Sequence, residues 1–177
     1  AKSAEMPEFF TKRGRSAFTD WYTTAFRAVR GHTMNLAVDA KYALWWSSVG
    51  GGMISDLQFA RHTPSPASVA YANVSGILAG HVFAGKIDLG SSYTKAYLFR
   101  KGGHYTLVAF TDDPDRESQV YVEAGGRKIQ ILNHYGNPVS YERAGSMLKL
   151  RLNPLTPLYV TGITRMPAES KPVLKTD

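Results

Sequence analysis

Two adjacent tryptophans, Trp45 and Trp46, end the apolar run at 42–46, and three glycines follow at 50–52. Neighbouring side chains on a strand point to opposite faces, so one indole can enter a core while the other lines a ligand site. An indole is a flat apolar platform with one N–H donor, which suits stacking against a sugar ring. We predict that at least one of the two contacts a sugar, and we favour Trp46 over Trp45 because it lies nearer the strand end. Burial of both in a core is the alternative.

The carboxylate that follows the glycine-rich loop is a second candidate for sugar binding. Asp56 follows Gly50–Gly52 closely enough to hydrogen-bond a sugar hydroxyl, or it solvates a surface turn. The loop itself is either a close backbone approach to a ligand or a plain connection. A phosphate-binding loop is disfavoured because the Lys and Ser/Thr of a P-loop are missing. Asp39, just before the apolar run, reads as a helix-end or turn residue.

Nothing in the sequence indicates a metal, a cofactor or a catalytic residue. The chain has no cysteine, which excludes disulfides and thiolate ligands. No two histidines have metal-ligand spacing, and no G-x-S-x-G elbow is present for nucleophilic catalysis. The acidic run from Asp112 to Glu117 could offer oxygen ligands to calcium, but it lacks the EF-hand spacing. We therefore expect it to form a solvated hairpin turn.

Composition limits the partner classes. The net charge of +7 is spread over both halves, which argues against a specific nucleic-acid site. Binding to an acidic polymer remains the weaker alternative. No apolar run approaches the roughly 20 residues of a membrane helix, so we expect no membrane partner. The chain begins at Ala1 without a signal-peptide pattern, as in a processed or trimmed chain, so the compartment stays open, with a secreted or periplasmic one favoured.

Hydrophobic spacing predicts helices in the first half and strands in the second. Apolar residues at helical spacing predict a helix over 18–29 that Gly31 ends, and a second helix from Ser65 to Leu78 with Pro66 at its first position. A strand is expected between them, around Lys41–Ser48. From residue 81 onward, short runs of strand composition alternate with turn residues, which favours an antiparallel β-sandwich. The expected strands are His81–Asp88, Tyr93–Arg100, Tyr105–Thr111, Gln119–Glu123, Lys128–Leu132, Ser146–Leu152 and Leu158–Ile163.

The order of these pieces resembles the C-terminal part of clan A glycoside hydrolases. The motifs that carry the resemblance are YALWWSS at 42–48, TPSPASVAYANVSGILAG at 63–80, KAYLFRKGGHYTLVAFT at 95–111, YGNPV at 135–139 and TPLYVTGI at 156–163. The resemblance implies an α+β chain: a helix-strand-helix unit closing a (β/α)8 barrel, followed by an antiparallel β-sandwich of about seven to eight strands. The implied domains are the barrel end at 1–80, the sandwich at 81–164 and a tail at 165–177.

The resemblance also implies that the chemistry lies elsewhere. Clan A enzymes use two carboxylates on earlier barrel strands, and AKSAEMPEFF at 1–10 has no apolar run for such a strand. No catalytic role therefore carries over; only the aromatic platform of Trp45 and Trp46 does, since the C-terminal strand ends form the active face. The expected partner is an N-terminal chain with the rest of the barrel, and the expected substrate is a carbohydrate. The alternative is a non-catalytic β-sandwich that binds carbohydrate or serves in assembly.

Overall fold

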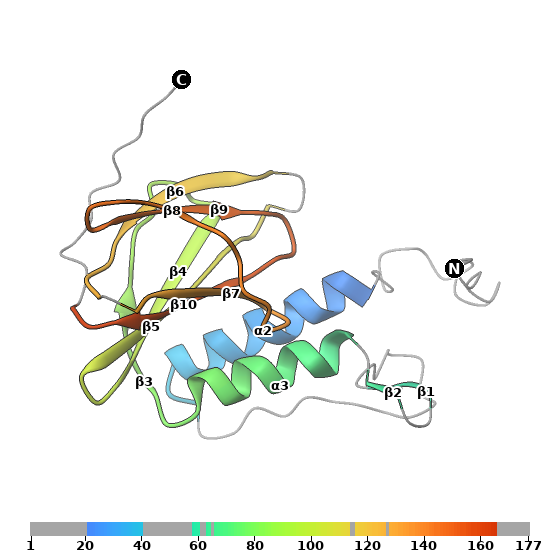
Figure 1. Ribbon diagram of the computed structural model, residues 1–177. Coiled ribbons are helices and arrows are strands. Elements are labelled where there is room, and N and C mark those ends of the chain that lie inside the picture. The colour runs from blue at the N-terminus through green and yellow to red at the C-terminus, as the bar shows by residue number, and fades with distance from the viewer. Residues whose placement is uncertain are drawn as a thin grey trace.

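A computed structural model describes residues 21–40, 58–60, 63–64, 66–113, 116–126 and 128–165. These residues form three layers, with a pair of helices on one side, a five-stranded sheet in the middle and a three-stranded sheet on the other side (Figure 1). The predicted α+β class with an antiparallel sandwich is confirmed. The strand expected at Lys41–Ser48 lies outside the described residues, and so does the tail beyond Arg165.

The helical layer consists of α2 (Trp21–Ala37) and α3 (Pro66–Leu78). The prediction that Gly31 ends the first helix is wrong. Thr33 is buried, and Leu36 and Ala37 pack against the helical core, so the apolar stripe continues beyond the glycine and its burial outweighs the glycine's cost of about 1 kcal/mol. α3 matches its prediction within a residue.

Each helix ends in a turn that needs a positive φ. Asp39 adopts a φ of 54° just after α2, as expected of a helix-end residue. Gly80 adopts a φ of 72° just after α3, and Lys101 Nζ donates to the carbonyl of Ala79 at 2.8 Å. The lysine thus satisfies a carbonyl that the end of α3 leaves without a helical partner.

The middle layer has the strand order β3-β4-β5-β10-β7, with every neighbouring pair antiparallel. Its strands are β3 (Val82–Lys86), β4 (Thr94–Lys101), β5 (His104–Thr111), β10 (Leu158–Ile163) and β7 (Gln130–Asn133). A separate two-stranded ladder joins β1 (Gln58–Ala60) to β2 (Thr63–Pro64) beside the start of α3.

The outer layer has the order β6-β9-β8. Its strands are β6 (Ser118–Glu123), β9 (Met147–Leu152) and β8 (Glu142–Ala144). All seven strands predicted from residue 81 onward are present, and β8, like β1 and β2, is an addition that the sequence did not predict. Burial alternates along β9: Leu148, Leu150 and Leu152 are all buried in the sandwich core, whereas the residues between them are more exposed.

Two hydrophobic cores lie on opposite faces of the middle sheet. Along β4, Ala96 and Leu98 point into the core between the two sheets, while Tyr97 and Phe99 point into the core beneath the helices. The core beneath the helices is rich in aromatic rings. It contains edge-to-face contacts such as Phe26 of α2 on Phe110 of β5, with ring centroids 5.6 Å apart. The middle sheet is therefore buried on both faces.

Candidate functional site

The predicted sugar platform, Trp45 and Trp46, and the predicted ligand Asp56 lie outside the described residues, as do the three glycines. These assignments stay predictions. The described structure shows the elements on either side of them: the turn after α2 at Asp39, and the β1–β2 ladder that leads into α3. In the described part of the chain, neither helix is long and apolar enough to cross a membrane.

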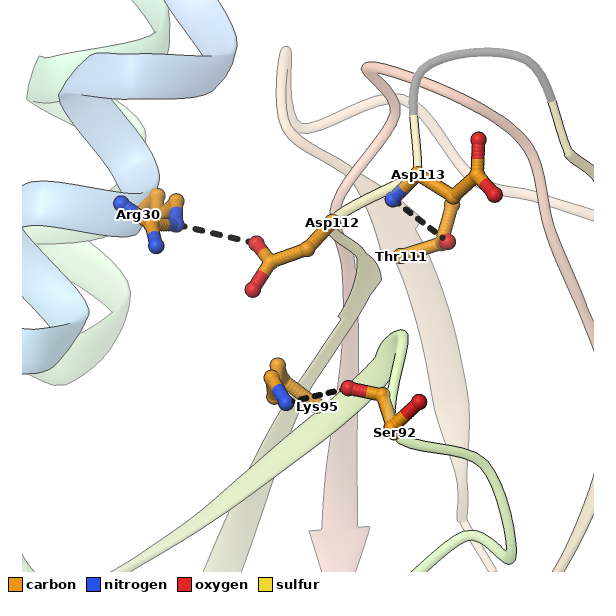
Figure 2. Close-up of polar contacts among 6 residues, drawn as sticks. All are labelled: Arg30, Ser92, Lys95, Thr111, Asp112 and Asp113. Atoms are coloured by element: carbon orange, nitrogen blue, oxygen red, sulfur yellow. Dashed lines mark hydrogen bonds and ion pairs between the residues drawn. The ribbon is translucent and has the colours of Figure 1, made fainter.

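Polar contacts join the helical layer to the loop after β5. The Nε of Arg30 on α2 donates to Asp112 Oδ1 at 2.9 Å, and the backbone N–H of Asp113 donates to the hydroxyl of Thr111 at 3.2 Å (Figure 2). Burial raises the pKa of Tyr97 beneath this junction, and the nearby Asp112 charge adds to the effect. The arrangement fixes the helix against the sheet.

The three described carboxylates of the acidic run each pair with a different cation. Asp112 pairs with Arg30, Asp113 with Arg116 at 3.5 Å, and Glu117 with the guanidinium of Arg151 at 2.5 Å. Three separate arginines thus neutralise three of its carboxylates. No group of three or more His, Asp or Glu residues that could hold a metal ion exists within the described ranges. The described carboxylates of the run therefore take part in ion pairs within the fold.

We expect the Arg30–Asp112 pair to contribute about 0.5–1 kcal/mol to the free energy of unfolding, because both side chains are partly open to solvent. A double-mutant cycle with Arg30→Met and Asp112→Asn, followed by urea denaturation, measures this coupling. The coupling should shrink between 0.05 M and about 1 M NaCl, where the Debye length falls to about 3 Å. A coupling near zero at low salt would contradict the assignment.

The described histidines differ in their surroundings. The ring of His134, after β7, is 3% exposed and packs on Tyr135, with ring centroids 3.8 Å apart. Neither of its ring nitrogens has a hydrogen-bond partner among the described residues, and burial lowers its pKa to about 4. Burial also lowers the pKa of His32 and of His81, whose Nε2 lies 3.3 Å from the Thr106 hydroxyl.

The tyrosines of the sandwich lie in different environments. Tyr97 is buried beneath the helices, and Tyr105 and Tyr135 pack partly into the two different cores. Tyr121 and Tyr141 are exposed on the side of the outer sheet. Sequence composition alone could not separate these environments, because tyrosine favours strands whichever face it occupies.

A cavity of about 270 Å³ opens at the edge of the sandwich, beside β8 and the segment that leads into it. Its floor is apolar and comes from both sheets: Ile131 of β7, Leu150 of β9 and Leu158 of β10. Its rim carries polar and aromatic side chains, among them Tyr141, Glu142 and Lys149. The sequence did not predict this site, because its residues come from strands far apart in the chain.

Comparison with solved structures places the fold. A family 39 glycoside hydrolase from Bacteroides cellulosilyticus superposes with a TM-score of 0.66 at 17% sequence identity, over 83% of this chain and 31% of that chain. A family 30 subfamily 8 xylanase from Clostridium acetobutylicum gives 0.60 at 10% identity, over 80% and 39%. A family 30 endoxylanase from Clostridium papyrosolvens gives 0.54 at 10% identity, over 84% and 40%.

This chain has the fold of one part of a clan A glycoside hydrolase. The resemblance predicted from the sequence motifs is thus confirmed at the level of the fold. The chain spans between 31% and 40% of the length of these three enzymes. No family model matches the chain, and no curated protein matches it in sequence. Since one fold can host many activities, function has to be argued from the site.

Proposed function

We propose that this chain forms the C-terminal part of a glycoside hydrolase. In this proposal it completes a (β/α)8 barrel and lines a sugar subsite with Trp46, Trp45 and Asp56. The two catalytic carboxylates lie on an N-terminal part that the chain joins. The main support is that about four-fifths of this chain superposes on only about a third of each enzyme.

The surface of the helical layer supports contact with further protein. Met34, Val38 and Val69 are large apolar side chains exposed on or beside α2 and α3. α3 contains no charged residue at all, although part of its surface is exposed. In a (β/α)8 barrel the outer helices cover the strands, so the rest of the barrel is the partner that this apolar surface fits.

The described carboxylates support placing the chemistry elsewhere. A retaining glycosidase needs two carboxylates about 5–5.5 Å apart on either side of the scissile bond. In the described part of the chain, Asp112, Glu117 and Glu142 are each engaged by a separate arginine or lysine. Each of these three carboxylates thus already has a cationic partner within the fold.

The test is to purify the protein from its native source under native conditions, identify every polypeptide in the preparation and assay hydrolysis of xylan and other polysaccharides. We expect activity only where this sequence is joined to, or bound by, a barrel that carries two catalytic carboxylates. In that assembly, Trp46→Ala should lower kcat/KM by about 10–100-fold, about 1.4–2.8 kcal/mol, through loss of one sugar contact. Tyr121→Ala, which removes a partly exposed ring of the outer sheet that the proposal does not place in the subsite, is the control for unspecific effects of the substitution.

A folded, monomeric chain that neither binds a barrel partner nor contributes to hydrolysis would refute the proposal. Oligosaccharide binding without hydrolysis in every assembly would favour the alternative, a non-catalytic carbohydrate-binding sandwich.

A further inference from the structure

The cavity at the sandwich edge exists because β8 is short. β6 pairs with β9 along its whole length, from Ser118↔Leu152 to Glu123↔Met147. β8 pairs with β9 only from Ala144↔Met147 to Glu142↔Lys149. Beyond Lys149, β9 therefore has a neighbouring strand on one side only. The cavity opens at this point, over the apolar floor of Leu150.

The segment before β8 forms one wall of the cavity and is held in place at several points. The backbone N–H of Val139 donates to the Ile131 carbonyl of β7 at 2.8 Å. The hydroxyl of Tyr141 donates to the Ile129 carbonyl at 3.1 Å, while 38% of the residue stays exposed. Tyr141 therefore presents a ring whose position is fixed before any ligand arrives, which reduces the entropy cost of binding.

The polar rim of the cavity consists of paired charges. Lys149 Nζ donates to Glu142 Oε2 at 3.1 Å, and the Nε of Arg151 donates to Glu117 Oε2 at 2.9 Å. Glu142, Lys149 and Arg151 line the cavity. Since both cations already have a carboxylate partner, the rim offers hydrogen-bond donors and acceptors without a large net charge. This chemistry suits hydroxyl groups better than it suits an acidic ligand.

We propose that this cavity binds one pyranose ring of a neutral oligosaccharide. The apolar floor and the Tyr141 ring face the C–H surface of the sugar, and the Glu142–Lys149 pair contacts its hydroxyls. The cavity volume, about 270 Å³, lies just below the roughly 300 Å³ at which pockets for drug-sized ligands begin. It therefore suits a single sugar ring, with the other rings of the oligosaccharide outside the cavity. The site is separate from the platform predicted at Trp45 and Trp46, and binding here needs neither a barrel partner nor hydrolysis.

The test is an NMR titration of the full 177-residue chain with xylohexaose, cellohexaose and mannohexaose, with an oligogalacturonide as the acidic comparison. We expect millimolar binding of at least one neutral sugar, with chemical shift changes centred on residues 139–142 and 149–151. Tyr141→Ala should weaken binding by about tenfold or more. Lys149→Met, which keeps the tyrosine wall intact, should also weaken binding and covers the case in which Tyr141→Ala does not fold.

Tyr121→Ala is the matched control, since Tyr121 of β6 is also 38% exposed but does not line the cavity. It should leave the affinity unchanged. Equal losses in the two tyrosine variants would place binding on the open sheet face and overturn the assignment to the cavity. An absence of shifts with every neutral sugar, or a preference for the oligogalacturonide, would each overturn the proposal. None of these outcomes bears on whether the chain completes a barrel.

Discussion

Replacing Gly162 by alanine should lower the free energy of unfolding by about 2–5 kcal/mol. Gly162 lies in β10 where the pairing with β5 shifts register between Val160 and Ile163, and its φ is 79°. An L-residue pays about 1–2 kcal/mol for such a backbone conformation. A Cβ at this position would also overlap the backbone carbonyl oxygen of Lys128, and relief of that overlap adds about 1–3 kcal/mol.

Gly145→Ala separates the two contributions. Gly145 also has a positive φ, 62°, but a Cβ there would meet no atom within 4 Å. We expect it to lose only the conformational part, about 1–2 kcal/mol. Urea denaturation of both variants beside the wild type measures the difference. If Gly162→Ala costs no more than Gly145→Ala, the close approach of β10 to the segment before β7 is not rigid, and the explanation fails.

The stability of the protein should fall by about 3 kcal/mol as pH is lowered from about 6.5 to about 4, through His134 alone. Burial depresses the pKa of His134 to about 4 in the folded state, against 6.5 for an ordinary histidine. Below pH 6.5 the unfolded chain therefore binds a proton that the folded chain does not, which favours unfolding. At pH values more than about one unit above 6.5, both states are neutral at this residue, and its contribution to the pH dependence vanishes.

The measurement is the free energy of unfolding against pH for the wild type and for His134→Phe, which keeps a ring on Tyr135 but cannot titrate. The difference between the two proteins should change by close to one proton's slope between pH 6 and pH 4.5. His32 and His81 are present in both proteins, so their similar response cancels in the comparison. Parallel profiles of unfolding free energy against pH would show that the pKa of His134 does not differ between the folded and unfolded states, which would contradict the prediction.

The strand pattern of the second half could be predicted from the sequence because turn residues separate its strands. The groups GSS at 90–92 and KGG at 101–103 mark turns on either side of β4, and Leu158–Ile163 was predicted with its observed bounds. α3 was equally clear, since Pro66 begins it and Gly80 follows its last turn. These signals are local, so the sequence around each boundary is sufficient to predict where the strand or helix begins and ends.

Other features depend on contacts that sequence periodicity cannot reveal. α2 continues beyond Gly31 because Thr33 and the residues after it are buried against other elements. β8 contains Glu142, Arg143 and Ala144, whose side chains are all exposed, so it has no hydrophobic pattern to detect. The cavity beside it was missed for the same reason, because its shape follows from where β8 ends. For Trp45, Trp46 and Asp56 the sequence remains the only guide.

The double burial of the middle sheet has a consequence for how this chain can be divided. Tyr97, Phe99, Phe110 and Tyr159 are buried beneath α2 and α3. Separating the helices from the sandwich, by recombination, gene fission or engineering, would expose this aromatic layer to solvent. An exposed apolar surface of this kind promotes aggregation. We therefore expect a transplanted segment to stay folded only when α2, α3 and the sandwich are moved together.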